Sequence, residues 1–283
     1  MASPPTPPVN PVVMVLMLIL WATVTTIFVI LLIKNKLSRM WRTTLWITSI
    51  VLGGILLGGV PNAVFPISQL FLAVGAGTFI IVILQQIIIL AVLIVSALFL
   101  GRTFCGVACP LGAAQELVSS WQFRSTIAGQ KKARFGVDIS PRIAPIIRWI
   151  FFGSFALLAF AWSISLVDLL NPFTGFKVFA NPWLPTFLIP VIALLLILST
   201  SVFIYRPWCR LFCPFGALTS LAAKYSRAKL WRTEQCTDCQ LCEKICPTHE
   251  AAREASKGEC YLCNRCVEIC PQHALKFGVK KPV

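Results

Sequence analysis

The sequence predicts an all-α membrane protein of five transmembrane helices, followed by a small cysteine-rich α+β domain at the C-terminus. The 283-residue chain is 57% hydrophobic and only 12% charged, which is too apolar for an ordinary soluble domain. Five apolar segments approach the roughly 20 residues needed to cross the hydrocarbon core of a bilayer. Twelve cysteines fall into four short motifs with none left over. Such grouping is typical of metal ligation rather than of a disulfide framework.

The five apolar segments define the expected membrane domain, residues 12–224, between a leader (1–11) and a C-terminal domain (225–283). The expected spans are residues 12–33, 43–60, 79–100, 149–167 and 187–205. The first segment could be a cleaved signal peptide. Its basic residues follow the apolar run instead of preceding it, and no small-residue cleavage site is evident, so a retained span is favoured.

Basic residues predict the orientation of the spans. Most of them lie in the connections after the first and third spans: Lys34, Lys36, Arg39, Arg42, Arg102, Arg124, Lys131, Lys132, Arg134, Arg142 and Arg148. Residues 61–78 carry no charge, residues 168–186 carry only two charged side chains, Asp168 and Lys177, and the leader carries none. The positive-inside rule then places the N-terminus outside and the tail inside a multi-pass cytoplasmic membrane protein. The formal charge is +15, but the basic residues form no continuous stripe with aromatic residues. This distribution argues against nucleic-acid binding.

An internal repeat organises the membrane domain. The segment GRTFCGVACPLGAAQEL (101–117) aligns with YRPWCRLFCPFGALTSL (205–221) at a constant offset of 104 residues. Each copy directly follows an expected span and is preceded by a pair of expected helices. The two units therefore run in the same direction, which is a parallel duplication about an axis along the membrane normal.

The strongest chemical signal is the pair CTDCQLCEKICP (236–247) and CYLCNRCVEICP (260–271). Both follow C-x2-C-x2-C-x3-C-P, in which three cysteines bind one [4Fe-4S] cluster and the fourth binds the other, as in bacterial two-cluster ferredoxins. Two zinc sites are the alternative, because C-x2-C also suits tetrahedral zinc. Thiols kept as ligands indicate a reducing compartment. The expected ligand sets are Cys236, Cys239, Cys242 and Cys270 for cluster 1, and Cys260, Cys263, Cys266 and Cys246 for cluster 2.

The only histidines, His249 and His273, each sit two residues after a cluster-closing proline. A hydrogen-bonding or exposed role near a helix start is favoured over ligation or proton relay. With no histidine in the expected spans, a bis-histidine haem cannot be built there. No C-x-x-C-H attachment motif occurs either, so no haem is expected.

The two C-x3-C-P motifs of the repeat leave three interpretations open. The favoured one is an Fe-S site shared between the copies, because four thiolates that converge on a pseudo-two-fold axis suit a cluster or a tetrahedral metal site. Redox-active thiol pairs are one alternative, and other metal or structural roles are the other. Arg102 and Arg206 precede the first cysteine of each motif by three residues. They are expected either to offset thiolate charge or to anchor a helix end at the headgroups. The four cysteines are Cys105, Cys109, Cys209 and Cys213.

A quinone pocket is expected but poorly localised by the sequence. Gln85 and Gln86 form a polar pair in the third expected span, where interhelical hydrogen bonding is the alternative role. Glu116 follows the first C-x3-C-P motif and is a candidate proton acceptor, with a solvated loop carboxylate as the favoured alternative. Arg102 and Arg206 complete the candidates. The nearly uncharged segments 61–71 and 168–179 are expected to be re-entrant elements that pack the two repeats together.

The whole pattern resembles the NapH/NosR/MauN-like family of ferredoxin-type membrane quinol dehydrogenases. The likeness covers residues 43–283 and is carried by FCGVACPLG, WCRLFCPFG, FPISQLF, NPFTGF and the paired cluster motifs. The resemblance implies quinol oxidation coupled to electron delivery through cytoplasmic-side clusters to a partner ferredoxin or reductase. Family members often have four spans, so the first span here is additional. The large extracytoplasmic flavin domain of NosR-type members is absent from the sequence, which favours a NapH-like role.

The functional expectation is an electron-transfer component of a quinol-oxidising membrane complex. Electrons pass between a membrane quinone and a soluble ferredoxin-like protein or reductase subunit, through the C-x3-C-P site and then two [4Fe-4S] clusters. The quinone handles two electrons and two protons, and the clusters separate the electrons into single steps. One alternative is a redox-sensing or maturation factor that uses the thiol pairs. The other is a passive membrane anchor for a catalytic subunit.

Overall fold

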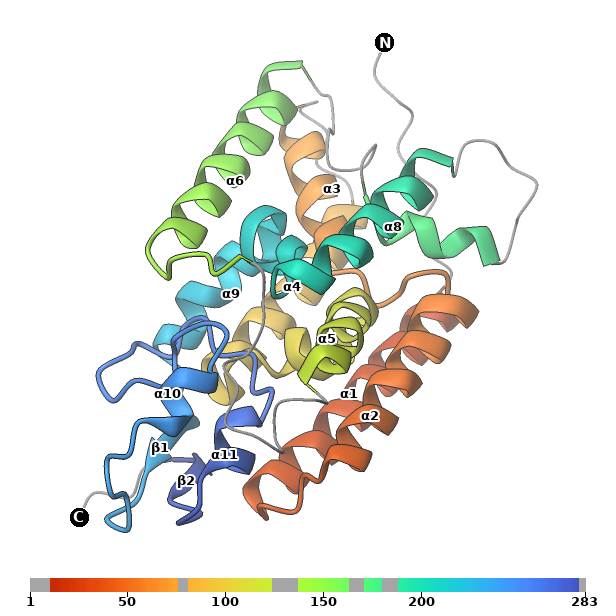
Figure 1. Cartoon of the computed structure of the whole chain (residues 1–283). Coiled ribbons are helices and arrows are strands. Elements are labelled where there is room, and N and C mark those ends of the chain that lie inside the picture. The colour runs from red at the N-terminus through yellow and green to blue at the C-terminus, as the bar shows by residue number, and fades with distance from the viewer. Residues whose placement is uncertain (1–10, 76–80, 124–136, 163–170, 180–187, 280–283) are drawn as a thin grey trace.

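The computed structural model describes residues 11–75, 81–123, 137–162, 171–179 and 188–279. A group of helices fills most of Figure 1, and the cysteine-rich domain lies at its lower left. Part of what the sequence predicts falls outside the described residues. This concerns almost all of the leader, the outer edges of the third, fourth and fifth expected spans, and the charged residues Arg124, Lys131, Lys132, Arg134 and Asp168.

Twelve helical elements precede the cysteine-rich domain in the part of the chain that the structure describes. In chain order they are α1 (Pro11–Ile33), α2 (Arg39–Thr48), the π-helix η1 (Ser49–Leu56), α3 (Val64–Gly75), α4 (Ile81–Leu100), the π-helix η2 (Phe104–Ala108), α5 (Pro110–Phe123), α6 (Ile143–Trp162), the 3-10 helix η3 (Thr174–Phe179), α8 (Leu188–Phe203), the π-helix η5 (Trp208–Phe212) and α9 (Pro214–Lys224).

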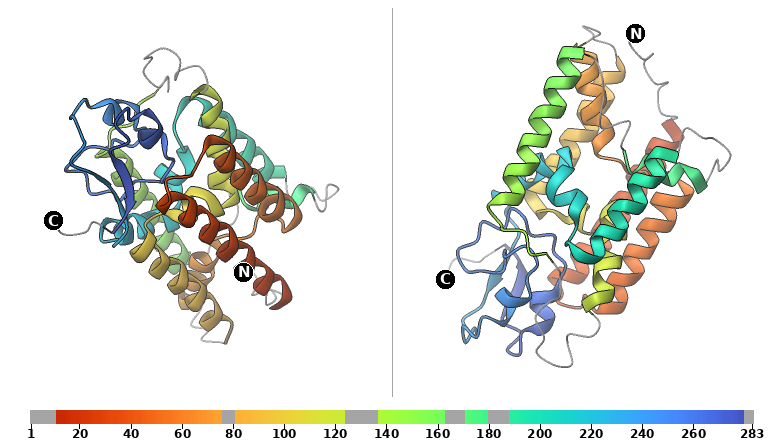
Figure 2. Two further views of the ribbon diagram at one scale, coloured as in Figure 1. Left: turned by 90° about the horizontal axis from the view of Figure 1, so that it is seen from below. Right: turned by 45° about the horizontal axis from the view of Figure 1, so that its top comes forward.

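Local signals explain where the first helices begin and turn. Asn35, at a φ of 50°, reverses the chain between α1 and α2, which form a hairpin in Figures 1 and 2. The Ser38 hydroxyl then caps α2 by accepting a hydrogen bond from the Trp41 amide at 3.4 Å. Helix α2 is amphipathic and buries Arg42, Leu45 and Trp46. It continues without a break into η1, which is almost entirely apolar.

The membrane spans are supported in part. Among the described residues, Ile143–Ala161 of α6 is long and apolar enough to cross a membrane by length and composition. Leu18–Ile33, Val64–Val74, Leu84–Leu100 and Leu188–Phe203 are shorter apolar helices. The five-span topology and its orientation therefore stay predictions.

One expectation about the edges of the spans is wrong. The helix expected over 149–167 begins at Ile143, so Arg148 lies within α6, where its side chain is fully buried, and not in the connection before that helix.

The segment 61–71 runs into a regular helix, α3, which packs against α4 and α6 and so touches both copies of the repeat. These contacts agree with the expectation that this segment packs the two repeats together, and its re-entrant path in a membrane stays a prediction.

The repeat is a structural one. Helix α2 begins at Arg39 and α6 at Ile143, and α5 and α9 begin at Pro110 and Pro214, so the offset of 104 residues holds at both ends. The copies exchange contacts, because α4 packs against α9 and α5 packs against α8. Within each copy, η1 packs against α5, and α6 packs against α9. This reciprocal packing brings η2 and η5, which hold the C-x3-C-P cysteines, into one buried core.

The C-terminal domain has the α+β make-up expected of a small ferredoxin. Strand β1 (Lys229–Arg232) pairs antiparallel with β2 (Leu275–Gly278), and the short helices α10 (Leu241–Ile245) and α11 (Arg265–Ile269) lie between them in sequence. The domain is docked on the helices rather than tethered. The backbone amides of Arg227 and Ala228 donate to the carbonyls of Leu98 and Phe99 at 3.0 Å. The side-chain amide of Asn264 donates to the Leu37 carbonyl at 3.1 Å.

Candidate functional site

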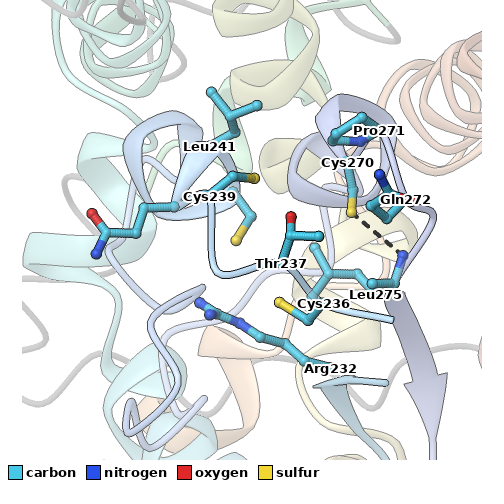
Figure 3. Close-up of a pocket in the computed structure, with 12 residues that line it drawn as sticks. Arg232, Cys236, Thr237, Cys239, Leu241, Cys270, Pro271, Gln272 and Leu275 are labelled. Carbon is cyan, nitrogen blue, oxygen red and sulfur yellow. Dashed lines mark hydrogen bonds between the residues drawn. The ribbon is translucent and has the colours of Figure 1, made fainter. Parts of the chain in front are cut away.

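Four cysteines line the first cavity of the C-terminal domain, which encloses about 360 Å³ of space. They are Cys236, Cys239, Cys242 and Cys270, the set that the sequence assigned to cluster 1. Figure 3 shows Cys236 and Cys270 on facing parts of the wall, with the Ala274 amide donating to the Cys270 sulfur at 3.4 Å. The fourth of these cysteines comes from the second motif, and its role as a ligand of cluster 1 stays a prediction.

The second cavity, of about 440 Å³, lies between this domain and the helices. Its wall contains Cys246, Cys260, Cys263 and Cys266, the set assigned to cluster 2. Leu32 of α1 and Tyr205, which follows α8, also line it. One side of this cavity is therefore formed by the expected membrane domain.

A third cavity, of about 330 Å³, lies between the two copies of the repeat. It is lined by Cys105 and Cys109 of the first copy and by Cys209 and Cys213 of the second. All four side chains are buried. The structure therefore brings the two C-x3-C-P motifs together, as the sequence symmetry predicts.

The same backbone geometry recurs at the last cysteine of all four C-x3-C-P motifs. Cys109, Cys213, Cys246 and Cys270 each end a short helix at φ between −75° and −70° and ψ between 111° and 119°. The following proline begins a new helix in the two repeat motifs, where its missing amide hydrogen costs nothing. The sulfurs of Cys109 and Cys213 accept hydrogen bonds from the amides of Gly112 (3.4 Å) and Gly216 (3.3 Å). The repeat motifs thus present their cysteines as the ferredoxin motifs do.

Arg102 and Arg206 cross between the copies. Arg206 donates to the carbonyl of Cys105 at 2.5 Å, and Arg102 donates to the carbonyl of Gly216 at 2.8 Å. The two side chains are at most 1% exposed, so they do not reach a membrane surface, and the expectation that they anchor helix ends at the headgroups is wrong. They hold the two halves of the third cavity against each other.

Each of these arginines has a carboxylate partner. Glu116 binds Arg206 at 2.7 Å and Arg265 at 2.5 Å, and it accepts a hydrogen bond from the Tyr205 hydroxyl at 2.6 Å. Burial alone would raise the pKa of Glu116, but the positive charges of Arg265 and Arg206 outweigh it, and the pKa is lowered. The expectation of a solvated loop carboxylate is wrong, because Glu116 is fully buried on α5.

A second carboxylate, that of Glu259, pairs with Arg102, the arginine of the first repeat copy. Glu259 binds Arg102 at 2.7 Å and Arg148 at 2.5 Å. Because Glu259 and Arg265 flank cysteines of the second cavity, both ion-pair clusters join the C-terminal domain to the repeat. A buried pair of this kind is costly to break, since one charge then stays uncompensated.

Tyr261 connects the second and third cavities. It lies between two cysteines of the second cavity and lines it. Its ring is 4.4 Å from the Arg102 guanidinium carbon and 4.7 Å from that of Arg206. A side chain at Gly106, between the cysteines of the first repeat motif, would meet the Tyr261 carbonyl at 2.6 Å. The two cavities are therefore separated by packed side chains and backbone.

The donor sets fit iron-sulfur clusters. Each cavity carries four thiols, the usual protein ligands of a [4Fe-4S] cluster. They surround a space rather than a point, and among the described residues no three His, Cys, Asp or Glu side chains lie close enough to hold a single metal ion. Burial raises the pKa of the Cys109 and Cys213 thiols, and it raises that of Cys209 to about 11. Ligation would have to displace these protons.

Other candidates from the sequence lie apart from the cysteines. Gln86 is buried on α4 and Gln85 is half-buried, and neither is among the lining residues of the cavities described here. His249 and His273 occupy equivalent positions with φ of 59° and 47°. His249 lies 3.1 Å from the carboxylate of Asp138. Both histidines follow a helix and do not start one.

Sequence reasoning missed Arg148, Glu259, Tyr261 and Arg265. Three of them are adjacent to the cysteines of the second C-x2-C-x2-C-x3-C-P motif, and this adjacency was the available signal. Arg148 carried the weaker signal of a charge at the edge of an apolar run.

Comparison with known proteins agrees with the cysteine motifs. A family described as a 4Fe-4S binding domain matches residues 86–129 and 186–232, which contain both repeat motifs. An uncharacterised protein of Methanocaldococcus jannaschii is 32% identical over 58% of this chain and 66% of its own length. YccM of Escherichia coli, named for electron transport, is 30% identical over 57% of this chain and 45% of its own length. The regulatory protein NosR of Pseudomonas aeruginosa is 35% identical over 53% of this chain and 21% of its own length.

These matches span between about a fifth and about two thirds of the relatives' lengths. No solved structure matches the chain. The matched segments contain the repeat whose cysteines form the third cavity, and the relatives include a protein named for electron transport. The chain therefore contains a match to a 4Fe-4S binding domain and is similar over about half of its length to YccM and NosR.

Proposed function

We propose that this protein carries electrons between membrane quinol and a partner redox protein through three [4Fe-4S] clusters. The single observation that carries the proposal is the recurrence of one Cys-Pro backbone geometry in all four C-x3-C-P motifs, two of which belong to a ferredoxin-type domain. The names of YccM and NosR, and the family match at the repeat, support the electron-transfer role.

The residues of the chain would hold three clusters in three four-thiol sites. Cys236, Cys239, Cys242 and Cys270 hold the first, Cys246, Cys260, Cys263 and Cys266 the second, and Cys105, Cys109, Cys209 and Cys213 the third. When bound, the clusters supply one-electron redox chemistry. Clusters held there would supply one-electron acceptors for the two electrons of a quinol, whose two protons would pass to water.

The remaining residues of the site exclude water and fix geometry. Arg102 and Arg206 keep the repeat halves closed and place positive charge beside the thiolates, which lowers the cost of burying them. Tyr261 fills the space between the second and third sites with a ring, so that no water layer separates them. A membrane anchor without redox activity would need none of this buried charge around its cysteines.

The partner is expected to receive electrons at the first cavity. Cys239 there is exposed, whereas Cys242 is buried, and the other two cavities lie deeper in the molecule. We therefore expect a soluble ferredoxin-like protein or a reductase subunit to approach the C-terminal domain from the cytoplasm, within a larger membrane complex. Electron transfer to such a partner needs a short distance, which this cavity offers.

Iron content of a cysteine variant tests the third cluster. The purified wild-type chain should carry about twelve iron atoms, and the Cys105→Ala, Cys209→Ala double variant about eight, because one [4Fe-4S] cluster is lost. EPR spectra of the dithionite-reduced samples should keep the signals of the two ferredoxin-type clusters. The matched control is Cys236→Ala, Cys260→Ala, which should keep the third cluster's signal instead. Equal iron in the wild type and the first double variant would refute the third cluster.

Quinol oxidation separates this proposal from its rivals. Full-length protein in lipid nanodiscs should be reduced by decylubiquinol or menadiol, as seen from bleaching of the iron-sulfur absorbance. A redox sensor or maturation factor would turn over negligibly, and a passive anchor would show clusters that dithionite reduces and quinol does not.

A further inference from the structure

A fourth cavity lies outside the cysteine sets, between α2, α5 and the C-terminal domain. It spans about 890 Å³ including the part open to solvent, at least twice the space of each cysteine-lined cavity. The volume that can hold ligand atoms is about 280 Å³, near the lower end of the size range of small-molecule sites. Its wall is formed by Arg39, Arg42, Thr43, Trp46, Ser120, Ile245, Cys263, Arg265, Glu268 and Ile269. We propose that this cavity binds the headgroup of the quinol, an inference that rests on the proposed function and gives it a location.

The cavity adjoins two of the three cysteine sites. Cys263 belongs both to its wall and to the wall of the second cavity. Trp46 donates a hydrogen bond from its indole nitrogen to the carbonyl of Gly106 at 3.2 Å, and Gly106 lies between the cysteines of the first repeat motif. A ligand held here therefore lies against Cys263, which belongs to the second cysteine site. The Trp46 side chain alone separates it from the backbone of the first repeat motif, which belongs to the third site. A site for a lipid without redox chemistry would gain nothing from this position.

The wall carries more positive than negative charge. Arg42 binds Glu268 at 2.6 Å and also donates to the Cys263 carbonyl, so this pair is neutral. Arg265 binds Glu116, which also binds Arg206, so three arginines and one glutamate line the wall itself. The guanidinium of Arg39 is exposed and has no hydrogen-bond or ion-pair partner among the described residues. A ligand with electron-rich oxygens is therefore favoured over a cation.

The hydroxyls of the wall distinguish a quinol from a phosphate. Thr43 donates its hydroxyl hydrogen to the Arg39 carbonyl at 3.0 Å, and Ser120 donates its own to the Leu117 carbonyl at 2.8 Å. Both hydroxyl oxygens thus keep lone pairs that can accept. A quinol has two O–H donors to offer them and oxygens that accept from Arg39, whereas a phosphodiester has no donor at all.

The apolar part of the wall suits a flat ring with an apolar tail. Trp46, Ile245 and Ile269 give the cavity aromatic and aliphatic surface. Helix α2 continues into η1, where Val51, Leu52 and Leu56 are exposed apolar side chains. The cavity therefore lies where the charged first turn of α2 meets an apolar surface. An amphipathic molecule could place its polar ring beside the charged turn and its apolar tail along the apolar surface.

The earlier candidates for the quinone site are better explained by other contacts. Glu116, Arg102 and Arg206 are fully buried in ion pairs. Glu116 nevertheless reaches this cavity through Arg265, which it binds and which forms part of the wall.

Variants that alter only this wall test the site. Arg39→Ala should raise the KM for decylubiquinol and for menadiol about tenfold, the loss typical of a hydrogen bond from a charged group, with kcat changed less than twofold. Thr43→Phe should block the cavity and lower kcat/KM at least a hundredfold. The matched controls are Thr44→Phe, the same change at the exposed neighbouring residue, and Lys36→Ala, a basic residue in the turn before α2. Both should behave as the wild type.

Three outcomes would show either that the proposed function fails, that the quinol binds elsewhere, or that the cavity binds a lipid headgroup. Every variant should be reduced by dithionite and keep the wild-type EPR spectrum, which shows that the clusters are intact. Wild-type protein that dithionite reduces and quinol does not would overturn the proposed function itself. Quinol-active wild type with an unchanged KM in Arg39→Ala and Thr43→Phe would overturn only this site. If those variants lose co-purifying phosphatidylglycerol by native mass spectrometry while their quinol kinetics stay normal, the cavity is a lipid-headgroup site and the inference is wrong.

Discussion

At the scale of single residues, Glu116 shows how far local sequence can mislead. It follows a cysteine motif in a stretch of mixed polarity, which favours a solvated position. The partners that bury it, Arg206 and Arg265, lie 90 and 149 residues further along the chain. A pattern read over a short stretch of sequence cannot reveal ion-pair partners at such separations. The cysteine sets were predictable because metal ligation imposes fixed spacing, whereas an ion pair imposes none.

Replacing Glu116 by Gln should destabilise the protein. The change leaves the buried guanidinium groups of Arg206 and Arg265 without a compensating charge, which typically costs about 3–5 kcal/mol. Thermal unfolding of full-length protein in detergent at pH 7 measures the effect. Glu234→Gln is the matched control, since Glu234 is exposed and forms no ion pair with another described residue. Equal melting temperatures of the two variants would mean that the network around Glu116 does not stabilise the fold.

The difference between wild type and Glu116→Gln should disappear in acid. The pKa of Glu116 is lower in the folded protein than its usual value of 4.5. The charged carboxylate therefore stabilises the folded state at every pH above that usual value. As pH falls further, through the lower pKa of the folded state, this contribution is lost. The difference between the two melting curves should be constant from pH 7 to pH 5 and should narrow as the pH falls below 4.5, and a difference that does not narrow on acidification would contradict the assignment.

At the scale of elements, the C-x3-C-P turn depends on close backbone approach. The cysteine ends a π-helical turn and the proline starts the next helix, so the glycine two residues beyond the proline comes close to the carbonyl of the first cysteine. A side chain at Gly112 would meet the Cys105 carbonyl at 2.5 Å, and one at Gly216 would meet the Cys209 carbonyl at 2.8 Å. Neither neighbour is a side-chain tip that can move aside. The sequence showed these glycines as aligned positions, and the structure supplies the reason for them.

Gly112→Ala should therefore disrupt the third cavity. We expect a lower melting temperature and a loss of iron from the third site, because the backbone must shift to relieve the contact. Gly153→Ala is a matched control, since nothing lies within 4 Å of its added Cβ in α6. Alanine there should stabilise the helix by about 0.5–1 kcal/mol. Iron analysis and melting curves of the two variants give the comparison, and a neutral Gly112→Ala would show that the turn tolerates a side chain.

At the scale of the whole molecule, the sequence predicted which repeats and domains the chain contains better than it predicted the contacts between them. The repeat follows from the constant offset of 104 residues, and the cysteine sets that line the three cavities were grouped by motif spacing and by the symmetry of the repeat. The docking of the domain does not, because it relies on isolated contacts such as Asn264 to Leu37 and Arg42 to Glu268. The position of α6 was also misjudged, since Arg148 reads as a loop residue until Glu259 is brought beside it.

The orientation in the membrane gives a further prediction. Basic residues just after α1 and in α2 predict that the ferredoxin-type domain lies on the cytoplasmic side. Green fluorescent protein fused after Val283 should fluoresce, and alkaline phosphatase fused at the same point should be inactive. Fusions at residue 77, in the uncharged connection, should give the opposite pair of results. An active phosphatase at the C-terminus would invert the topology.

The reciprocal arginines also set the timing of assembly during synthesis. Arg102 donates to a carbonyl 114 residues ahead of it, and Arg206 donates to one 101 residues behind it. The first C-x3-C-P motif leaves the ribosome long before Gly216 exists. At ~5–20 residues per second, that wait lasts about 5 to 20 s. During this interval Cys105 and Cys109 lack the second repeat copy that buries them in the complete structure. We therefore expect these two thiols to be most open to oxidation or to binding a wrong metal before the second copy is synthesised.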